Sequence, residues 1–153
     1  MAWRLEWETR GMNRTEHVLA TMATMPDAEY RPLHVQKLFF LMDRQVPEAI
    51  GGPRFNFTPY DYGPFDPQVY RELETLAQAG LIKIENRTSR DRIYKLTEKG
   101  REAGVELRKA MDLKAQEYSK AIVSWMLPLR FDEIVRAVYQ SYPEMRSNSV
   151  FRG

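Results

Sequence analysis

The chain has 153 residues, of which 43% are hydrophobic and 29% charged, with 23 basic and 21 acidic side chains and a net charge of +2. This length and composition predict one soluble domain with enough interior to fold unaided, and the mild charge does not by itself identify a nucleic-acid binder. The lack of cysteine excludes disulfides, thiolate chemistry and cysteine-rich zinc sites. No apolar run approaches the roughly 20 residues of a membrane span, and no signal peptide is recognisable, so we expect a cytoplasmic protein.

The sequence divides into an N-terminal arm at residues 1–12, a single domain at residues 13–145 and a flexible tail at residues 146–153. In the arm, Trp3 and Trp7 share one face in either a strand or a helix, because apolar and charged residues alternate around them. Since exposed tryptophans are unfavourable, we expect the arm to pack on its own domain or on a partner chain.

Two helices are expected at the start of the domain. Asn13 or Thr15 can cap a helix that continues to Met25 and ends at the following proline. A second helix begins at Pro32, a residue well placed in a first helical turn, and runs to about Val46. Its apolar positions are spread over more than one side, which predicts that the helix is buried on more than one side.

Lys37 is a charged residue within this mostly apolar second helix. Two explanations are open for it. The aliphatic stem can snorkel so that the ammonium reaches the surface, which we favour, or the ammonium can pair with an acid such as Asp61. A Lys37→Met variant that folds and binds normally would argue against a special role.

A strand and a turn are expected next. Phe55 and Phe57 alternate with polar residues, which suits a short strand. Gly63 and Pro64 then form a tight turn, in which the glycine supplies a backbone conformation that other residues resist and the proline fixes the turn.

A third helix is sharply delimited in the sequence. Asp66 is a strong N-cap residue and Pro67 follows at the first helical position. Apolar residues then repeat at helical spacing to Ala79, and Gly80 is the expected left-handed stop. The helix is therefore predicted from Pro67 to Ala79.

A β-hairpin with a basic tip follows, with strands near residues 81–84 and 93–96. Residues 83–95 contain two acidic side chains and five basic ones, which are Lys83, Arg87, Arg90, Arg92 and Lys95. The local excess of positive charge is typical either of an ordinary solvated hairpin or of a phosphate-binding one, and the sequence leaves both open.

Two further helices complete the domain. Thr97 caps a long helix that Pro128 ends or kinks, and a last helix is expected over Phe131–Tyr142. Apolar residues of the long helix recur in a heptad-like pattern that can pack on the domain's own core or on the same helix of a second subunit. The candidates for such a homodimer contact are Met111, Tyr118, Ile122 and Trp125.

This order of elements is that of a winged helix-turn-helix. The fold class is therefore predicted as mostly α with a small β-hairpin wing, extended by long C-terminal helices. In such domains one helix enters the major groove and the wing places basic residues on phosphates. The predicted DNA-binding residues lie on the third helix and on the hairpin: Gln68, Arg71, Thr75, Gln78, Lys83, Arg87, Arg90 and Arg92. Glu72 is expected on the same outward side of the third helix, and Glu74 also lies on this helix. Because acids repel phosphates, we expect the hairpin to provide the stronger phosphate contacts.

Several stretches resemble known bacterial families. RIYKLTEKGREAG (92–104) resembles the end of the wing and the following helix in many bacterial winged-helix regulators. LHVQKLFFLMD (33–43), FNFTPYDYGPFDPQVYRELETLAQAGLI (55–82) and VYQSYPEM (138–145) together resemble the Panacea antitoxin domain and related uncharacterised proteins with a Tyr-Gly-Pro motif. That resemblance implies a protein that acts by binding a toxin protein.

The resemblance also implies candidates for a protein interface, which lie on the second helix, in the turn and at the start of the third helix. They are Lys37, Tyr60, Tyr62, Gly63, Pro64, Phe65, Asp66 and Tyr70. Aromatic residues are enriched in interfaces, although each of these is also a candidate for ordinary core packing.

Catalysis is not favoured by any motif. His17 and His34 have no metal-ligand spacing around them, apart from Glu16 beside His17, and no phosphate loop, nucleophile elbow or dinucleotide fingerprint is present. The neighbouring carboxylates Asp61 and Asp66 are explained as a turn residue and an N-cap. We therefore expect no catalytic residue, metal or cofactor.

The sequence thus predicts a non-catalytic winged-helix protein that binds a macromolecule. The partner is duplex DNA, for a transcriptional regulator, or a cognate toxin, for an antitoxin. The alternative is a protein-interaction module without DNA binding.

Overall fold

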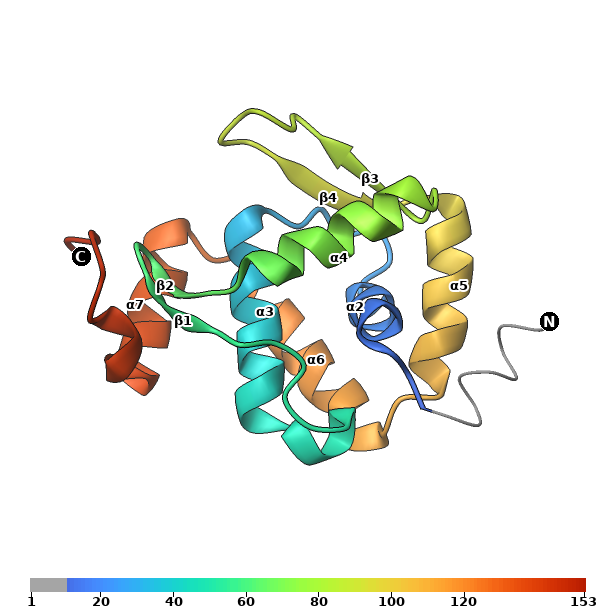
Figure 1. Ribbon diagram of the computed structural model, residues 1–153, viewed down its shortest axis with the longest axis horizontal. Coiled ribbons are helices and arrows are strands. Elements are labelled where there is room, and N and C mark those ends of the chain that lie inside the picture. The colour runs from blue at the N-terminus through green and yellow to red at the C-terminus, as the bar shows by residue number, and fades with distance from the viewer. Residues whose placement is uncertain (1–10) are drawn as a thin grey trace.

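The computed structural model describes residues 11–153 (Figure 1), so the expectations for Trp3 and Trp7 lie outside the described residues. This part of the chain is mostly helical and carries two small antiparallel sheets. Its α-helices are α2 (Arg14–Met22), α3 (Pro32–Gln45), α4 (Pro67–Gln78), α5 (Glu98–Lys109), α6 (Leu113–Met126) and α7 (Phe131–Ser141). Its strands are β1 (Thr58–Tyr60), β2 (Gly63–Phe65), β3 (Ile82–Glu85) and β4 (Ile93–Leu96), and two 3-10 turns are η1 (Pro47–Ile50) and η2 (Pro143–Arg146).

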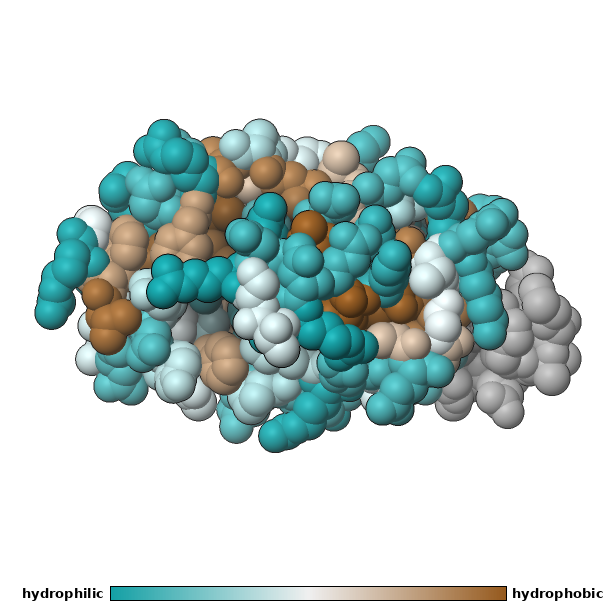
Figure 2. Space-filling view, turned by 90° about the horizontal axis from the view of Figure 1, so that it is seen from above, coloured by the Kyte–Doolittle hydropathy of each residue, from teal (hydrophilic) through white to brown (hydrophobic). Residues whose placement is uncertain are grey.

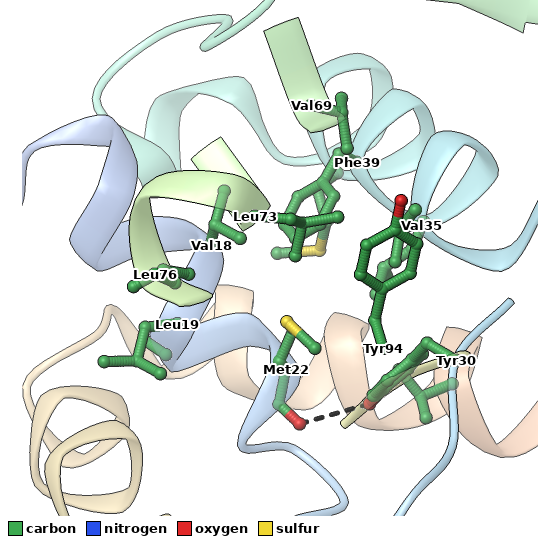
Figure 3. Packing of buried hydrophobic residues seen from close by; sticks show 14 of the residues in the cluster. Val18, Leu19, Met22, Tyr30, Val35, Phe39, Val69, Leu73, Leu76 and Tyr94 are labelled. Atoms are coloured by element: carbon green, nitrogen blue, oxygen red, sulfur yellow. Dashed lines mark hydrogen bonds between the residues drawn. The ribbon is translucent and has the colours of Figure 1, made fainter. Parts of the chain in front are cut away.

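Helices α2, α3 and α4 meet in the main hydrophobic core, to which α5, α6 and α7 also contribute buried side chains. Figure 3 shows side chains from α2, α3 and α4 pointing toward one another, among them Met22 of α2, Phe39 of α3 and Leu73 of α4. The start of α2 follows the sequence signal, because Asn13 accepts a hydrogen bond from the Glu16 backbone N–H at 2.8 Å and its own N–H donates to the Glu16 carboxylate at 2.9 Å. None of the described helices has the length and apolar content needed to cross a membrane.

A pair of buried tyrosines joins the β3–β4 hairpin to this core. The Tyr30 N–H donates to the Tyr94 carbonyl at 2.9 Å, and the Tyr94 N–H donates back to the Tyr30 carbonyl at 2.7 Å. The Tyr30 hydroxyl also donates to the Met22 carbonyl at 3.2 Å (Figure 3). The segment between α2 and α3 therefore acts as a third, one-residue strand beside β4, and it fixes where the hairpin lies relative to the helices.

Helix α4 has the ends that the sequence predicts. The Asp66 carboxylate accepts from the Gln68 N–H at 2.9 Å, and Pro67 is the first helical residue. Gly80 has φ +76° just past the helix, and the next N–H, that of Leu81, donates to the Leu76 carbonyl at 2.9 Å. Local signals were sufficient here because each acts within a few residues along the chain.

The Leu-Thr-x-x-Gly sequence that ends the hairpin has a structural explanation. Thr97 caps α5 by accepting from the Gly100 N–H at 3.0 Å, and its hydroxyl donates to the Gly80 carbonyl at 2.7 Å. A Cβ atom on Gly100 would lie 1.7 Å from the Leu81 carbonyl oxygen, so no other residue fits without movement of the backbone. The motif therefore locks the end of α4 against the start of α5.

The predicted single long helix after Thr97 is wrong, because the chain breaks into α5 and α6. The break lies at Ala110–Asp112, where Asp112 caps α6 by accepting from the Lys114 N–H at 2.9 Å. Helix α5 packs against α2, whereas α6 packs against α3 (Figure 1). One straight helix could not reach both neighbours, so tertiary packing overrides the heptad-like pattern.

The side chain of Arg108 stabilises the turn between α5 and α6. One guanidinium nitrogen donates to Thr24 at 2.7 Å and to Ser119 at 2.9 Å, and the other donates to the Gln116 carbonyl at 2.8 Å. The side chain thus links α5 to α6 and to the segment that follows α2.

The strand expected from Phe55 begins only at Thr58, where β1 pairs with β2 in a second hairpin. The predicted Gly63-Pro64 turn is displaced, because Gly63 pairs with Tyr60 inside the ladder and the tip lies before it. Gly63 has φ +106°, a conformation that favours glycine. The Tyr-Gly-Pro motif thus spans the tip of a hairpin and the start of its return strand.

The tail predicted to be flexible packs on the tip of that hairpin. The Val150 N–H donates to the Asp61 carbonyl at 2.9 Å, and the Asn148 amide donates to the Pro59 carbonyl at 3.3 Å. Tyr139 of α7 donates to the Ser149 hydroxyl at 2.6 Å. The tail carries no secondary-structure signal, so only its contacts with distant residues order it, whereas α7 itself lies where the sequence predicted.

Candidate functional site

The outer side of α4 presents a short stripe of polar side chains. Arg71, Thr75 and Gln78 are all exposed, and their spacing of four and three residues puts them on one face of the helix. The Arg71 guanidinium donates to the Gln68 side chain at 3.1 Å, which orients it along the helix. Three of the four predicted α4 contacts are therefore accessible together.

Glu72 does not point outward as the sequence analysis assumed. Its side chain is buried, at 6% exposure, and it accepts from the Arg14 guanidinium at 2.9 Å and from the Gln68 amide at 2.8 Å, as well as from the Thr15 hydroxyl. Burial by itself would raise the pKa of Glu72, but the three hydrogen bonds outweigh it and keep the pKa below the usual range. Glu72 therefore joins α4 to α2, and its negative charge does not lie on the outer face of α4.

The other acid of α4, Glu74, lies beside the β3–β4 hairpin. Its carboxylate pairs with the Arg87 guanidinium at 2.5 Å, and both side chains are about half exposed. An anion that binds Arg87 would therefore compete with Glu74 for it.

The hairpin carries three exposed basic side chains, Lys83, Arg87 and Arg90. The fourth predicted contact, Arg92, is half-buried and stacks over the Tyr70 ring at 5.7 Å while donating to the Tyr94 hydroxyl at 2.9 Å. Arg92 is thus mainly part of the hairpin's own structure. Figure 2, which views the molecule from the hairpin side, shows mostly hydrophilic side chains with small hydrophobic areas between them.

A continuous series of aromatic rings runs from the β1–β2 hairpin to β4. Tyr60 stacks on Phe65 at 4.8 Å, Phe65 meets the edge of Tyr70 at 5.8 Å, and Tyr70 stacks on Tyr94 at 6.3 Å between ring centroids. Exposure decreases along the series, from 52% at Tyr60 to 2% at Tyr94.

A second exposed aromatic pair lies at the tip of the β1–β2 hairpin. Tyr62 makes an edge contact with Phe131 of α7 at 5.0 Å, and the two rings are 42% and 48% exposed. Together, Tyr60, Tyr62 and Phe131 form what we call the tyrosine surface. Large half-exposed rings held by their neighbours are typical of protein interfaces.

Polar side chains of α3 anchor the β1–β2 hairpin. Gln36, which the sequence analysis did not select, uses its amide to accept from the Asp66 N–H at 2.9 Å and to donate to the Asp66 carbonyl at 3.0 Å. The Asp66 carboxylate in turn accepts from the Asn56 N–H at 2.8 Å. Gln36 could have been identified from the sequence as a polar residue within the mostly apolar helix α3.

Neither explanation offered for Lys37 is correct. The side chain is buried, at 3% exposure, and the ammonium nitrogen donates to the Pro64 carbonyl at 3.1 Å instead of reaching solvent or Asp61. Burial lowers the pKa of Lys37 to about 7. A Cβ on Gly63 would lie 3.4 Å from the Lys37 Cε, which is ordinary van der Waals contact, so the φ of +106° and not the space beside the lysine accounts for the glycine.

Asp43 completes the set of buried polar groups on α3. Its two carboxylate oxygens accept from the Arg54 and Phe55 backbone N–H groups at 2.9 and 3.0 Å. Burial raises the pKa of Asp43, against the opposing effect of these hydrogen bonds. Gln36, Lys37 and Asp43 thus hold residues 54–66 on α3, and their roles are positional.

The dimerisation candidates lie mainly in the protein's own interior. Met111 is buried, Tyr118 and Ile122 pack against the core, and only Trp125 is exposed, at 39%. A homodimer remains a prediction, and its contact on α6 would have to centre on Trp125.

The candidates for chemistry do not converge. His34 accepts from the Arg31 N–H at 3.0 Å and so caps α3, and His17 is buried beside Phe39. Within residues 11–153, no group of three His, Asp or Glu side chains is arranged to hold a metal ion. Asp66 uses both carboxylate oxygens on backbone N–H groups, as described above, and Asp61 engages the tail through its carbonyl.

Comparisons of this chain with protein-family models, with curated proteins and with solved structures found no match. The relationship to Panacea-like proteins and to winged-helix regulators therefore remains a prediction from the sequence.

Proposed function

We propose that this protein is a non-catalytic winged helix-turn-helix protein that binds duplex DNA through α4 and the β3–β4 hairpin. One observation carries the proposal. The exposed stripe Arg71–Thr75–Gln78 lies beside a hairpin that exposes Lys83, Arg87 and Arg90, while Glu72 is turned into the core. The order of helices and the pairing of Tyr30 with Tyr94 support the winged-helix description.

In this proposal α4 enters the major groove, which is wide enough to admit a helix. Arg71 and Gln78 have side chains that read base edges, with arginine suited to guanine and glutamine to adenine. The hairpin contacts the backbone, where Arg87 exchanges the Glu74 carboxylate for a phosphate. Because few phosphates are contacted, binding is expected to be weak without a specific site and to fall as salt increases.

Fluorescence anisotropy with labelled duplex DNA at low salt tests the proposal. The wild type should bind, and an Arg87→Ala/Arg90→Ala variant should lose most of that affinity. A matched control, Arg101→Ala/Arg136→Ala, removes the same charge from exposed positions on α5 and α7 and should bind normally. The absence of wild-type binding at low salt would contradict the proposal.

A second candidate function is binding of a partner protein through the tyrosine surface. The observation that favours it is the anchoring of this surface, since Gln36 and Lys37 hold the β1–β2 hairpin in place while Tyr60 and Tyr62 remain half exposed. Aromatic side chains that are already ordered lose little freedom on binding. A cognate toxin, as the Panacea resemblance implies, would be such a partner.

Co-purification with the product of the adjacent gene tests this second candidate. A Tyr60→Ser/Tyr62→Ser variant should lose the partner while binding DNA as the wild type does. Thr58→Ser/Asn56→Ser, at exposed neighbouring positions, is the control and should retain it. Recovery of the same protein by both variants would contradict this assignment of the surface.

A further inference from the structure

A cavity of about 500 Å³ lies away from the β3–β4 hairpin, at the end of the molecule formed by the start of α2, the η1 turn and the turn between α5 and α6. Its size is within the range of small-molecule sites. Apolar side chains contribute much of the wall, namely Met12, Ala49, Ile50 and Met111. Three polar or charged side chains, His17, Arg54 and Asp112, also line it, and the Asp112 carboxylate already accepts a hydrogen bond from the Lys114 N–H at 2.9 Å as the cap of α6.

His17, one of the lining residues, has a buried hydrogen-bonding atom without a partner among the described residues. The residue is 2% exposed, and its Nε2 atom has no hydrogen-bond partner among residues 11–153. Burial, helped by the positive charge of Arg54, lowers the pKa of His17 to about 3, so the ring is neutral at pH 7. Buried polar atoms almost always have a partner, so an unpartnered one points to a missing water or ligand.

Arg54 has unused donors and forms no direct ion pair with an acidic side chain of the described residues. Its Nε donates to the Ile50 carbonyl at 2.7 Å and one terminal nitrogen donates to the Met12 carbonyl at 2.9 Å, which uses two of the five N–H groups of a guanidinium. Asp43 accepts from the Arg54 and Phe55 backbone N–H groups, so within residues 11–153 its negative charge acts on the guanidinium without an ion pair between the two side chains. A half-buried cation of this kind is a ready site for an anion.

We propose that the cavity binds a small organic carboxylate, whose anionic group pairs with Arg54 and whose apolar body lies between the η1 turn and the α5–α6 turn beside His17. The guanidinium suits a carboxylate because its planar N–H groups match the two oxygens. A hydroxyl or a second polar atom on the ligand would satisfy His17. The site is independent of the DNA surface, so its existence does not rest on the proposed function.

Histidine ring NMR tests the proposal directly, because the chain has only two histidines. Benzoate and isovalerate serve as probes, one aromatic and one branched aliphatic. Either carboxylate should shift the His17 ring signals saturably and leave those of His34, on α3, unchanged. Benzyl alcohol, which has the ring of benzoate without its charge, should bind at least tenfold more weakly.

Variants separate the site from non-specific binding. Ala110→Phe places a ring in the cavity from an exposed position, and Arg54→Gln removes the cation; each should weaken binding of the carboxylate at least tenfold. Ala121→Phe, at an exposed position of α6 outside the cavity wall, should bind as the wild type does. If Arg54→Gln does not fold, as circular dichroism would reveal, Ala110→Phe decides the question.

The proposal is overturned if neither carboxylate shifts the His17 signals, or if His34 shifts in parallel with His17. It is also overturned if benzyl alcohol binds equally well or if Ala110→Phe retains the wild-type affinity. Full affinity in a folded Arg54→Gln variant would likewise remove the basis for a carboxylate site.

Discussion

The side-chain amide of Gln36 forms two hydrogen bonds with the backbone of Asp66, accepting from its N–H at 2.9 Å and donating to its carbonyl at 3.0 Å. The pair lies 30 residues apart in sequence and is buried. It joins α3 to the residue that caps α4, so it helps to fix where α4 begins relative to α3.

A Gln36→Glu variant tests this link. The new carboxylate keeps the shape of the amide but cannot donate to the Asp66 carbonyl, and it places a charge in the interior. We expect the free energy of unfolding to fall by about 2–4 kcal/mol, since the buried Asp66 carbonyl loses its hydrogen-bond donor and the new carboxylate is buried without a partner for its charge. Urea denaturation provides the measurement, with Gln140→Glu at an exposed position of α7 as the control. Equal effects of the two substitutions would contradict the role given to Gln36.

Lys37 should leave a signature in the pH dependence of stability. The pKa of Lys37 is about 7 in the folded protein and 10.5 in an ordinary lysine. Between these pH values the unfolded chain binds more protons than the folded one, so Lys37 makes the free energy of unfolding rise with pH, at most by about 1.4 kcal/mol per pH unit. Below about pH 7 both states are protonated and this dependence disappears.

A Lys37→Met variant removes that contribution and should show a flatter profile between pH 7 and 10 than the wild type. Urea denaturation across this range measures both proteins, and Lys120→Met, at an exposed position of α6, should keep the wild-type profile. Parallel profiles for the wild type and Lys37→Met would show that the buried amine does not titrate in this range.

Two glycines should respond very differently to alanine. Gly80→Ala meets open space and only has to adopt φ +76°, which costs about 1–2 kcal/mol. Gly100→Ala places its Cβ 1.7 Å from the Leu81 carbonyl oxygen, so the end of α4 and the start of α5 must separate, at a cost of more than about 4 kcal/mol. Thermal unfolding of the two variants should rank them in this order, and the reverse order would refute the explanation of the Leu-Thr-x-x-Gly motif.

The two acids of α4 should also differ. Glu72→Ala breaks the contacts with Arg14 and Thr15 and should lower the free energy of unfolding by about 2–4 kcal/mol. Glu74→Ala leaves stability within about 0.5 kcal/mol, because an exposed ion pair contributes little, but it releases Arg87 and removes a negative charge from the proposed DNA surface.

Denaturation and DNA binding, measured on the same two variants, separate these effects. Glu74→Ala should bind duplex DNA more tightly than the wild type at low salt. A loss of affinity on removing Glu74 would argue against a DNA surface at this place.

The parts of the fold that the sequence predicted correctly depend on local chemistry. Asp66, Pro67 and Gly80 act within a turn of the helix that they delimit, so their effect can be recognised without knowing the fold. The break at Ala110–Asp112 escaped prediction because it contains neither glycine nor proline and follows from what α5 and α6 pack against.

Burial of polar side chains was the main feature that the sequence did not reveal. Helical spacing placed Glu72 on the outer face of α4. The sequence could not reveal its burial, because its partner Arg14 lies 58 residues away along the chain. Gln36 and Lys37 likewise meet partners 30 and 27 residues along the chain. Most of the candidate DNA contacts are exposed, because exposure on a helix face or in a hairpin follows from local spacing. That they contact DNA stays a prediction.

Mapping of the contact surface tests the central claim most directly. Backbone amide NMR signals of the labelled protein would be followed while duplex DNA is added at low salt. We expect the largest shifts on α4 around Arg71, Thr75 and Gln78 and on the hairpin from Lys83 to Arg92, with little change at Tyr60 and Tyr62. The absence of any shift, or shifts confined to the tyrosine surface, would contradict DNA binding through α4 and the β3–β4 hairpin.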